Sequence, residues 1–332
     1  MPPVVLDIRH LRTILPTGDT PLVLVDDVSL SVHAGETLAV VGESGSGKTM
    51  TFLSVLGLTP PAIRIASGAV MLDGVDLTQL DAEALRVRRG AVISMVFQDP
   101  LTALNPLFTI GAQIVRVIRA HRRIGQAEAR VLAEQVLRRV HIPDPAKRMD
   151  DYPHQLSGGM RQRVLIAMAI ALGPKVLIAD EPTTALDVTV QAQILELLAE
   201  LQRETGMGIV LITHDLGLVA RYGSRVAVMY GGRVVESGTV DAVFAQPLHP
   251  YTAALFRSIP GLDAALEGDL PAIDGQPPML ADLPPGCAFE PRCFLGQGRS
   301  DCRTQRPPLD AILRGEQRSA CPHGDALAME ER

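Results

Sequence analysis

The chain has 332 residues, of which 47% are hydrophobic and 20% charged, and its formal net charge is −6. This composition predicts one large domain or two with a substantial core, and the acidic balance does not favour a broad nucleic-acid-binding surface. The N-terminus lacks the basic and apolar segments of a secretory signal, and no apolar run approaches the ~20 residues that cross a bilayer. We therefore expect a cytoplasmic chain.

Short β-branched runs alternate with longer helical patterns from about residue 4 to residue 240, which predicts an α/β fold with a largely parallel sheet. The expected strands are 37–41, 92–97, 176–180, 209–213 and 225–230. Gly231 and Gly232 predict a hairpin after the last of these strands. Between residues 100 and 155 the strand patterns stop and apolar residues keep a helical spacing, so we expect a helical subdomain over about 100–165.

A glycine-rich loop lies between the first of these strands and a run, 50–58, that can form a helix. It is a complete G-x-x-x-x-G-K-T motif, formed by Gly42, Glu43, Ser44, Gly45, Ser46, Gly47, Lys48 and Thr49. The glycines let backbone N–H groups turn toward an anion, and the helix start adds a partial positive charge. Lys48 adds a full charge, and the Thr49 hydroxyl suits a phosphate-bound Mg²⁺. The loop therefore predicts a nucleotide-phosphate site.

Two carboxylates, Asp180 and Glu181, stand at the C-terminal end of the predicted strand 176–180. Ligands of open α/β sheets bind at this end of the strands. We interpret Asp180 as a residue that holds the Mg²⁺ shell, and Glu181 as the residue that orients or deprotonates an attacking water. Taken alone, the pair could equally be a solvated acidic pair at the turn before Pro182.

The segment 156–162, Leu-Ser-Gly-Gly-Met-Arg-Gln, lies between these two motifs and resembles the signature motif of ATP-binding cassette (ABC) ATPases. Ser157, Gly158 and Gly159 at a helix start would form a second phosphate-binding surface. Gln162 stands later than the glutamine of the commonest form, a variant that resembles peptide importers. The resemblance implies that Ser157, Gly158, Gly159 and Gln162 contact the ATP of a partner subunit. A plain helix cap by Ser157 is the alternative, but it leaves the coincidence with the glycine-rich loop unexplained.

Three further segments resemble the same family in the same order. Gln98 resembles the glutamine that senses Mg²⁺ and water, the segment 185–187 resembles the D-loop, and His214 resembles the switch histidine that contacts the γ-phosphate. The resemblance implies the P-loop NTPase fold of the ABC ATPase type over residues 1–240. It also implies catalytic roles for Lys48, Gln98, Glu181 and His214, with Thr49, Gln98 and Asp180 around Mg²⁺.

One feature of the family is missing before the glycine-rich loop. Cassette ATPases usually stack adenine on an aromatic side chain, and the nearest equivalents here are Ile14 and Leu15. Because neither offers a π face, adenine would be held by apolar packing alone. ATP is the expected nucleotide, and tolerance of GTP stays open.

The remaining residues, 241–332, are expected to form a small C-terminal extension. Its first part, 246–252, resembles the oligopeptide and dipeptide transporter subfamily, and all four cysteines follow it: Cys287, Cys293, Cys302 and Cys321. Disulfides do not suit a reducing cytosol, so four gathered thiolates suggest a metal centre. The subfamily resemblance implies a 4Fe-4S cluster, while zinc or plain thiols stay open because C-x2-C pairs are absent.

The resemblance implies an ATPase subunit that energises import of dipeptides or oligopeptides through a membrane permease. It further implies a second ATPase subunit in a heterodimer, two integral-membrane permease subunits, an extracytoplasmic binding protein and a place on the cytoplasmic face of the plasma membrane. The alternatives are a nickel or glutathione importer, an exporter subunit or a soluble cassette ATPase that acts on nucleic acid. The last is not expected, because the chain has no basic arm.

Overall fold

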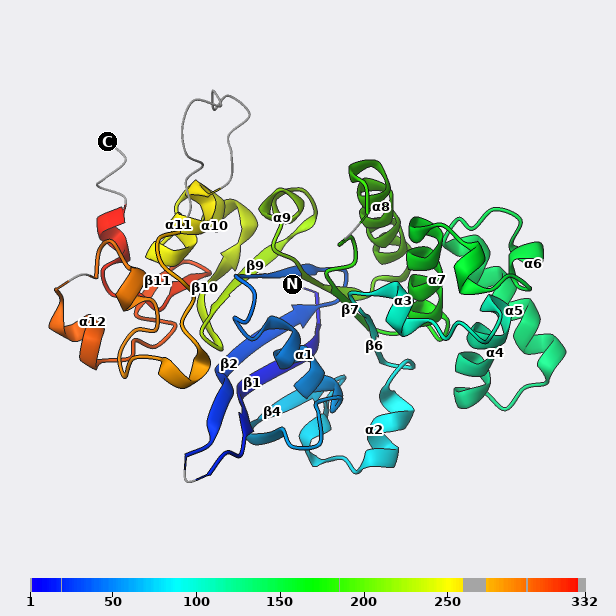
Figure 1. Cartoon of the computed structure of the whole chain (residues 1–332), viewed down its shortest axis with the longest axis horizontal. Coiled ribbons are helices and arrows are strands. Elements are labelled where there is room, and N and C mark those ends of the chain that lie inside the picture. The colour runs from blue at the N-terminus through cyan, green and yellow to red at the C-terminus, as the bar shows by residue number, and fades with distance from the viewer. Residues whose placement is uncertain (1, 19, 185, 259–272, 297, 328–332) are drawn as a thin grey trace. The chain divides into compact units, whose positions relative to one another are not determined.

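The computed structural model describes residues 2–18, 20–184, 186–258, 273–296 and 298–327 (Figure 1). The chain divides into two compact units. The first contains Met1–Leu6, Val32–Glu36 and Leu72–Leu211, and the second contains Asp7–Ser31, Thr37–Met71 and Ile212–Arg332. No helix in the described ranges is long and apolar enough to cross a membrane.

The first unit contains parallel strands and a group of helices. Its strands include β5 (Val75–Asp76), β6 (Ile93–Val96), β7 (Val176–Asp180) and β8 (Gly208–Ile212), and β6 pairs with β7 in parallel. All five residues of β7 and of β8 are buried, as expected of strands covered on both faces. The register between β6 and β7 places Val96 opposite Ala179, so the residues that follow the two strands leave the sheet at the same edge.

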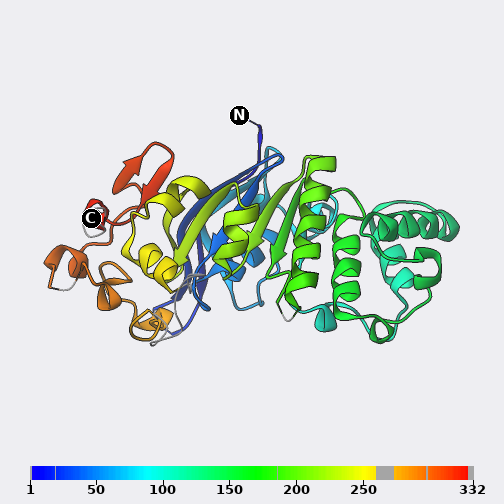
Figure 2. The same cartoon turned by 90° about the horizontal axis from the view of Figure 1, so that it is seen from above.

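Residues 100–155 form helices and no strand, as the spacing of apolar residues predicts. The α-helices of this segment are α3 (Pro100–Ala103), α4 (Ile110–His121), α5 (Gln126–Arg139) and α6 (Pro145–Arg148), and α7 (Gly158–Ile170) follows them. Figure 2 shows α4, α5 and α6 grouped beside α7. The unit also contains α2 (Ala82–Arg88) and α8 (Val188–Thr205).

The second unit contains β3 (Thr37–Val41), β9 (Arg225–Tyr230) and β10 (Arg233–Thr239). β3 pairs with β9 in parallel, and β9 pairs with β10 antiparallel. Gly231 and Gly232 between β9 and β10 have φ of +54° and +79°, which confirms the predicted hairpin. The helices here include α1 (Lys48–Leu56), α9 (Leu216–Tyr222), α10 (Val240–Ala245) and α11 (Pro250–Arg257).

The structure corrects the expected alternation at the N-terminus, where β1 (Val4–Leu15) and β2 (Leu22–His33) are neighbouring strands with no helix between them. β4 (Arg64–Leu72) lies on the other side of β1. Exposed and buried residues mix along β1, so it lacks the continuous apolar run that identifies the fully buried strands.

The residues after 240 add strands and apolar side chains to the second unit. β12 (Gln317–Ser319) pairs with β10, and β11 (Ile312–Arg314) pairs with β12. Phe289 and Tyr251 lie in one buried cluster with Val226 and Val228 of β9. A short helix, α12 (Ser300–Thr304), precedes these strands. The boundary at residue 240 stays a prediction, and the cluster shows that residues on both sides of it share a core.

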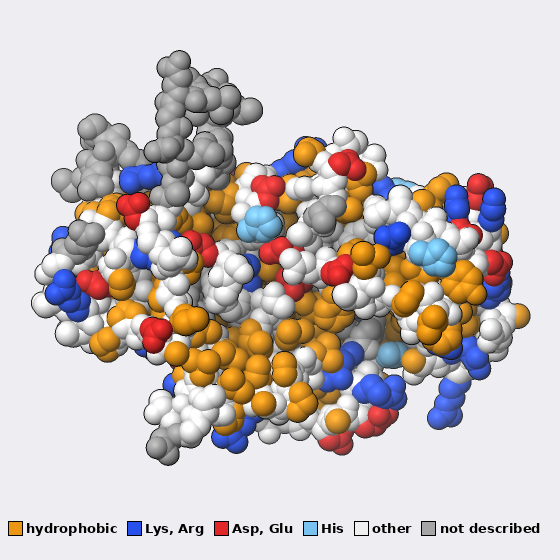
Figure 3. Space-filling model, viewed as in Figure 1, with side chains coloured by type: hydrophobic (Ala, Val, Ile, Leu, Met, Phe, Trp, Pro, Cys, Tyr) orange, Lys and Arg blue, Asp and Glu red, His pale blue; other side chains and the backbone are white. Residues whose placement is uncertain are grey.

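On the face drawn in Figure 3, Lys and Arg side chains are interspersed with Asp and Glu. The described part of that face is therefore mixed in charge.

Candidate active site

The glycine-rich loop connects β3 to α1, and close backbone contacts require two of its glycines. A Cβ on Gly42, whose φ is +150°, would lie 2.2 Å from the carbonyl oxygen of Met229. Gly47 has a φ of +99°, and a Cβ there would lie 3.1 Å from Gly232 Cα. Larger residues would force the loop away from the hairpin, so these glycines keep its backbone in place.

Lys48 is buried within the loop, with 6% of its surface exposed. Its Nζ donates to the carbonyl oxygens of Gly42 at 2.7 Å and Glu43 at 3.0 Å, and lies 3.5 Å from Ser46 Oγ. The loop thus holds a full positive charge where the sequence predicts phosphates.

The start of α1 is suited to an anion. Gly47 is the N-cap and supplies no side-chain cap, and the first turn of any helix has N–H groups without an intrahelical acceptor. Ser44, Gly45 and Thr49 are exposed, so a ligand can reach this side of the loop. Thr49 is the second residue of α1 and follows Lys48 directly.

His214 lies in the second unit, two residues after β8. The N–H of the preceding residue, Thr213, donates to the carbonyl oxygen of Val40 in β3 at 3.2 Å, and the His214 side chain is exposed. The histidine is therefore held close to the strand that leads into the glycine-rich loop.

In the first unit, Gln98 and Glu181 meet although 83 residues separate them. Each stands two residues beyond the paired residues Val96 and Ala179, and Gln98 Nε2 donates to Glu181 Oε2 at 2.9 Å. Thr184 Oγ1 also donates to Glu181 Oε2, at 2.9 Å. The structure therefore brings together two of the predicted catalytic side chains and orients one carboxylate oxygen with two donors.

Asp180 and Glu181 differ in environment. Asp180 ends β7 and is 4% exposed, whereas Glu181 is half-buried and has a φ of +44°. A non-glycine residue rarely adopts this backbone conformation, and such strain gathers at functional sites. The pair is thus not simply a solvated acidic turn, because the Asp180 carboxylate is buried and the Glu181 carboxylate accepts from Gln98.

The predicted signature segment forms the start of α7. Ser157 is the N-cap, and its Oγ accepts from the N–H of Met160 at 3.4 Å. Ser157 and Gly158 are exposed, which leaves them accessible to a ligand. Gln162 is 1% exposed, so its side chain cannot contact a nucleotide on another subunit from this position. We correct that expectation, because the fourth residue after Gly158 points to the inner face of α7.

Ile14 and Leu15 lie at the end of β1. Ile14 is buried and Leu15 is half-buried, so Leu15 is the more accessible of the two apolar side chains. Of the predicted D-loop, Leu186 and Asp187 are described and Ala185 lies outside the described residues. Asp187 caps α8 by accepting from the N–H of Val190 at 2.9 Å.

The four cysteines gather around one apolar cavity in the second unit and form no disulfide. Burial raises the pKa of Cys293 to about 11 and that of Cys321 to about 12, so without a metal these thiols are neutral at pH 7. Gly296 N–H lies 3.1 Å from Cys293 Sγ. The last cysteine lies 34 positions after the first in the sequence, and the fold brings all four to the same place.

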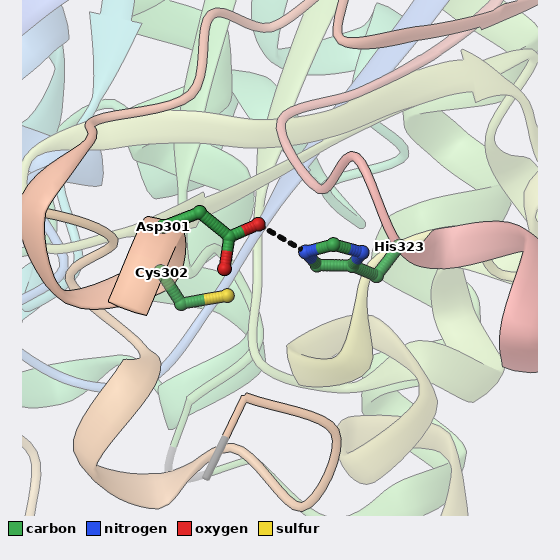
Figure 4. A group of neighbouring side chains, drawn as sticks. All are labelled: Asp301, Cys302 and His323. Carbon is green, nitrogen blue, oxygen red and sulfur yellow. Dashed lines mark hydrogen bonds and ion pairs between the residues drawn. The ribbon is translucent and has the colours of Figure 1, made fainter. Parts of the chain in front are cut away.

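Asp301 and His323 border the same region (Figure 4). Their ligand atoms and the Cys302 sulfur all lie within 4.8 Å of one another. His323 Nε2 and Asp301 Oδ2 are 2.8 Å apart, and this hydrogen bond lowers the pKa of Asp301. The region therefore offers nitrogen and oxygen ligands besides sulfur.

Sequence reasoning missed two side chains that contact the glycine-rich loop. Arg292 forms an ion pair with Glu43, and the Tyr251 hydroxyl accepts from the Glu43 N–H. Tyr251 lies in the segment 246–252 and Arg292 directly precedes Cys293, but no motif indicates what these two side chains contact.

Comparison with known proteins places these motifs in a family. The family model described as "ABC transporter" matches residues 25–184, and that described as "Oligopeptide/dipeptide transporter, C-terminal region" matches residues 235–302. A Brucella melitensis protein named as a peptide import ATP-binding protein is 51% identical over 319 residues, covering 93% of this chain and 94% of its own. The dipeptide transport ATP-binding protein DppD of Bacillus subtilis is 50% identical over 291 residues, covering 87% of this chain and 86% of its own.

A solved structure shares the fold. It is a dimeric ATP-binding cassette in a post-hydrolysis state bound to ADP and Pi, with 29% identity and a TM-score of 0.63. The match covers 71% of this chain and 98% of that one.

Proposed function

We propose, since this chain belongs to the ABC transporter family, that it is the ATPase subunit that energises import of dipeptides or oligopeptides through a membrane permease. The family match confirms the expected fold class, and two relatives that align with most of this chain are named for peptide import or dipeptide transport. Import of nickel or glutathione is the alternative within the same subfamily.

The contact between Gln98 and Glu181 carries the assignment of hydrolysis. In the proposed reaction, Glu181 orients or deprotonates the water that attacks the γ-phosphate, and Gln98 and Thr184 hold its carboxylate. Lys48 and the N–H groups of the glycine-rich loop neutralise phosphate charge, and His214 contacts the γ-phosphate. Mg²⁺, when bound, would neutralise charge beside Thr49, Gln98 and Asp180.

A second ATPase subunit is required by this proposal. The chain has one glycine-rich loop and one signature segment, and Ser157, Gly158 and Gly159 would contact the nucleotide of the other subunit. The dimeric relative supports this arrangement, and we propose a heterodimer. The assembly would further include two permease subunits and, indirectly, an extracytoplasmic binding protein, with this chain at the cytoplasmic face of the membrane and no nucleic acid partner.

We propose a 4Fe-4S cluster held by Cys287, Cys293, Cys302 and Cys321, four residues that line one cavity. The four cysteines that line the cavity match the ligand number of such a cluster. The Gly296 N–H beside Cys293 is the kind of group that donates hydrogen bonds to the sulfur atoms of a cluster. Metal binding would convert the buried thiols to thiolates and release their protons, although burial alone keeps the thiols protonated at pH 7. The cluster would link segments of a proline-rich region that has few regular elements.

The function is tested with Glu181→Gln in the complex purified from membranes. We expect ATP binding to persist and hydrolysis to fall by at least ~10²-fold, because the water loses its base. Glu204→Gln is the matched control, since Glu204 is exposed and pairs with Arg139 on the surface. Wild-type turnover in the Glu181 variant would refute the role.

Transport is tested by uptake of labelled dipeptides and tripeptides in cells that carry either variant. Peptide uptake should disappear with Glu181→Gln and persist with Glu204→Gln. Uptake of nickel or glutathione that depends on Glu181, without peptide uptake, would replace the peptide assignment.

The cluster is tested by purifying the full chain without oxygen. We expect a brown protein with absorption at about 400 nm and roughly four irons per chain, both lost in Cys321→Ala. Because the chain has four cysteines in all, no other thiol can substitute. A colourless protein with stoichiometric zinc would instead assign a zinc site to this cavity.

A further inference from the structure

Glu43, the second residue of the glycine-rich loop, is held by two side chains from the C-terminal region of the same unit. Arg292 Nη1 donates to Glu43 Oε2 at 2.7 Å, and Nη2 donates to Oε1 at 3.0 Å. The Tyr251 hydroxyl accepts from the Glu43 N–H at 2.8 Å. Both the side chain and the backbone of Glu43 are therefore engaged from outside the loop.

The Arg292 guanidinium is itself fixed in position. Its side chain is 5% exposed, and Nε donates to the carbonyl oxygen of Asp274 at 2.8 Å. It also lies 5.9 Å from the ring centres of Tyr230 and Phe289. A two-bond ion pair removed from water is stronger and more directional than a surface pair. Arg292 thus forms a rigid support for Glu43 and not a mobile surface contact.

Tyr251 is fixed as firmly as Arg292. It is fully buried, and its ring packs against Tyr230 and Phe289 with centres 4.6 and 5.3 Å away. Because the ring is held, the hydroxyl has a defined position relative to the Glu43 peptide.

The residue that these side chains hold is also the one that Lys48 contacts. Lys48 Nζ donates to the Glu43 carbonyl oxygen at 3.0 Å, so a shift of the Glu43 peptide would move an acceptor of the phosphate-binding ammonium. A loop that is already ordered binds its ligand more tightly, because less conformational entropy is lost on binding.

We propose that Arg292 and Tyr251 are positioning residues for ATP: they act through Glu43 to hold the glycine-rich loop in its phosphate-binding conformation. Neither side chain is required to touch the nucleotide. The inference rests on the proposed ATP-binding function and extends it, because it gives the C-terminal region a part in nucleotide affinity.

The test measures the Kd for ATP of the purified full chain. Arg292→Met should raise this Kd by roughly tenfold, the size expected for loss of a charged hydrogen-bonded pair. Arg292→Lys should raise it less, because the charge remains and the two-bond geometry is lost. Tyr251→Phe should raise it severalfold, since it keeps the ring packing and removes the hydroxyl.

Arg303→Met is the matched control. The Arg303 side chain is exposed and pairs with Glu290 in the same region, without a contact to Glu43, so its loss should leave the Kd for ATP unchanged. Melting temperature and absorption at about 400 nm, measured for every variant, separate loss of ATP affinity from unfolding or loss of the proposed cluster.

Coupling through Glu43 provides the decisive result. If Arg292 acts through Glu43, Arg292→Met should add little to the effect of Glu43→Gln. The proposal would be overturned if Arg292→Met raised the Kd for ATP by the same factor in the wild type and in Glu43→Gln. It would also be overturned if a folded Arg292→Met variant had an unchanged Kd for ATP. Should Arg292→Met not fold, an unchanged Kd in Tyr251→Phe would overturn it. A wild-type chain that binds no ATP would refute the proposed function itself.

Discussion

At the scale of single residues, function in this chain depends on pairs that lie far apart in sequence. Gln98 and Glu181 are neighbours because β6 and β7 are paired in parallel and both residues follow their strands at the same distance. The motif identified each residue, but their hydrogen bond follows from strand register. The backbone conformation of Glu181 is likewise a property of the fold.

His249 is a residue whose burial links pH to stability. It is 1% exposed, and its Nδ1 accepts from the Tyr251 N–H at 3.1 Å, at the start of α11. Burial lowers the pKa of His249 to about 3. The unfolded chain binds the proton more tightly, because the pKa of His249 is lower in the folded state than its unfolded value of about 6.5. The contribution of His249 to the stability of the folded state is therefore greatest above pH 6.5 and decreases as the pH falls toward 3.

We expect His249 to lower the free energy of unfolding by about 2 kcal/mol between pH 8 and pH 5, because it becomes protonated in the unfolded chain and stays neutral in the folded one. The measurement is urea unfolding at both pH values for the wild type and for His249→Asn, which keeps a neutral capping oxygen. The loss on acidification should be smaller by about this amount in the variant. Parallel losses in the two proteins would show that His249 does not carry this pH dependence.

At the scale of elements, the signature segment combines an accessible helix start with a close helix contact. A Cβ on Gly159 would lie 2.6 Å from Val190 Cγ1 of α8, whereas a Cβ on Gly158 would lie 3.4 Å from Leu186 Cδ2. The valine is stiff because it is branched at Cβ, so it cannot easily move away. The two adjacent glycines therefore differ in purpose: Gly159 permits close packing of α7 and α8.

Gly159→Ala should destabilise the protein by about 1–3 kcal/mol, because the added methyl group overpacks the contact between the two helices. The higher helix propensity of alanine offsets part of this loss. Gly158→Ala is the matched control, since its methyl group meets an ordinary contact distance and should leave stability nearly unchanged. Thermal unfolding of both variants checks this. Equal melting temperatures would contradict the role assigned to Gly159.

At the scale of the whole molecule, strands with continuous apolar runs were predicted well. The predicted bounds of β3, β7 and β9 match those of the structure, and β6 and β8 differ by one residue at each end. β1, β2 and β4 were not predicted, because their exposed and buried residues mix and their pairing depends on neighbours far along the chain.

The sequence alone determined the phosphate-binding loop, the acidic pair after β7, the signature segment and the family, because these depend on residue types at short, regular spacings. Only the tertiary structure decided that Gln162 is buried, that four cysteines share one cavity, and that Arg292 and Tyr251 hold Glu43 from 249 and 208 residues away. Contacts at such separations follow from how the core packs and the strands pair, and no local pattern encodes them.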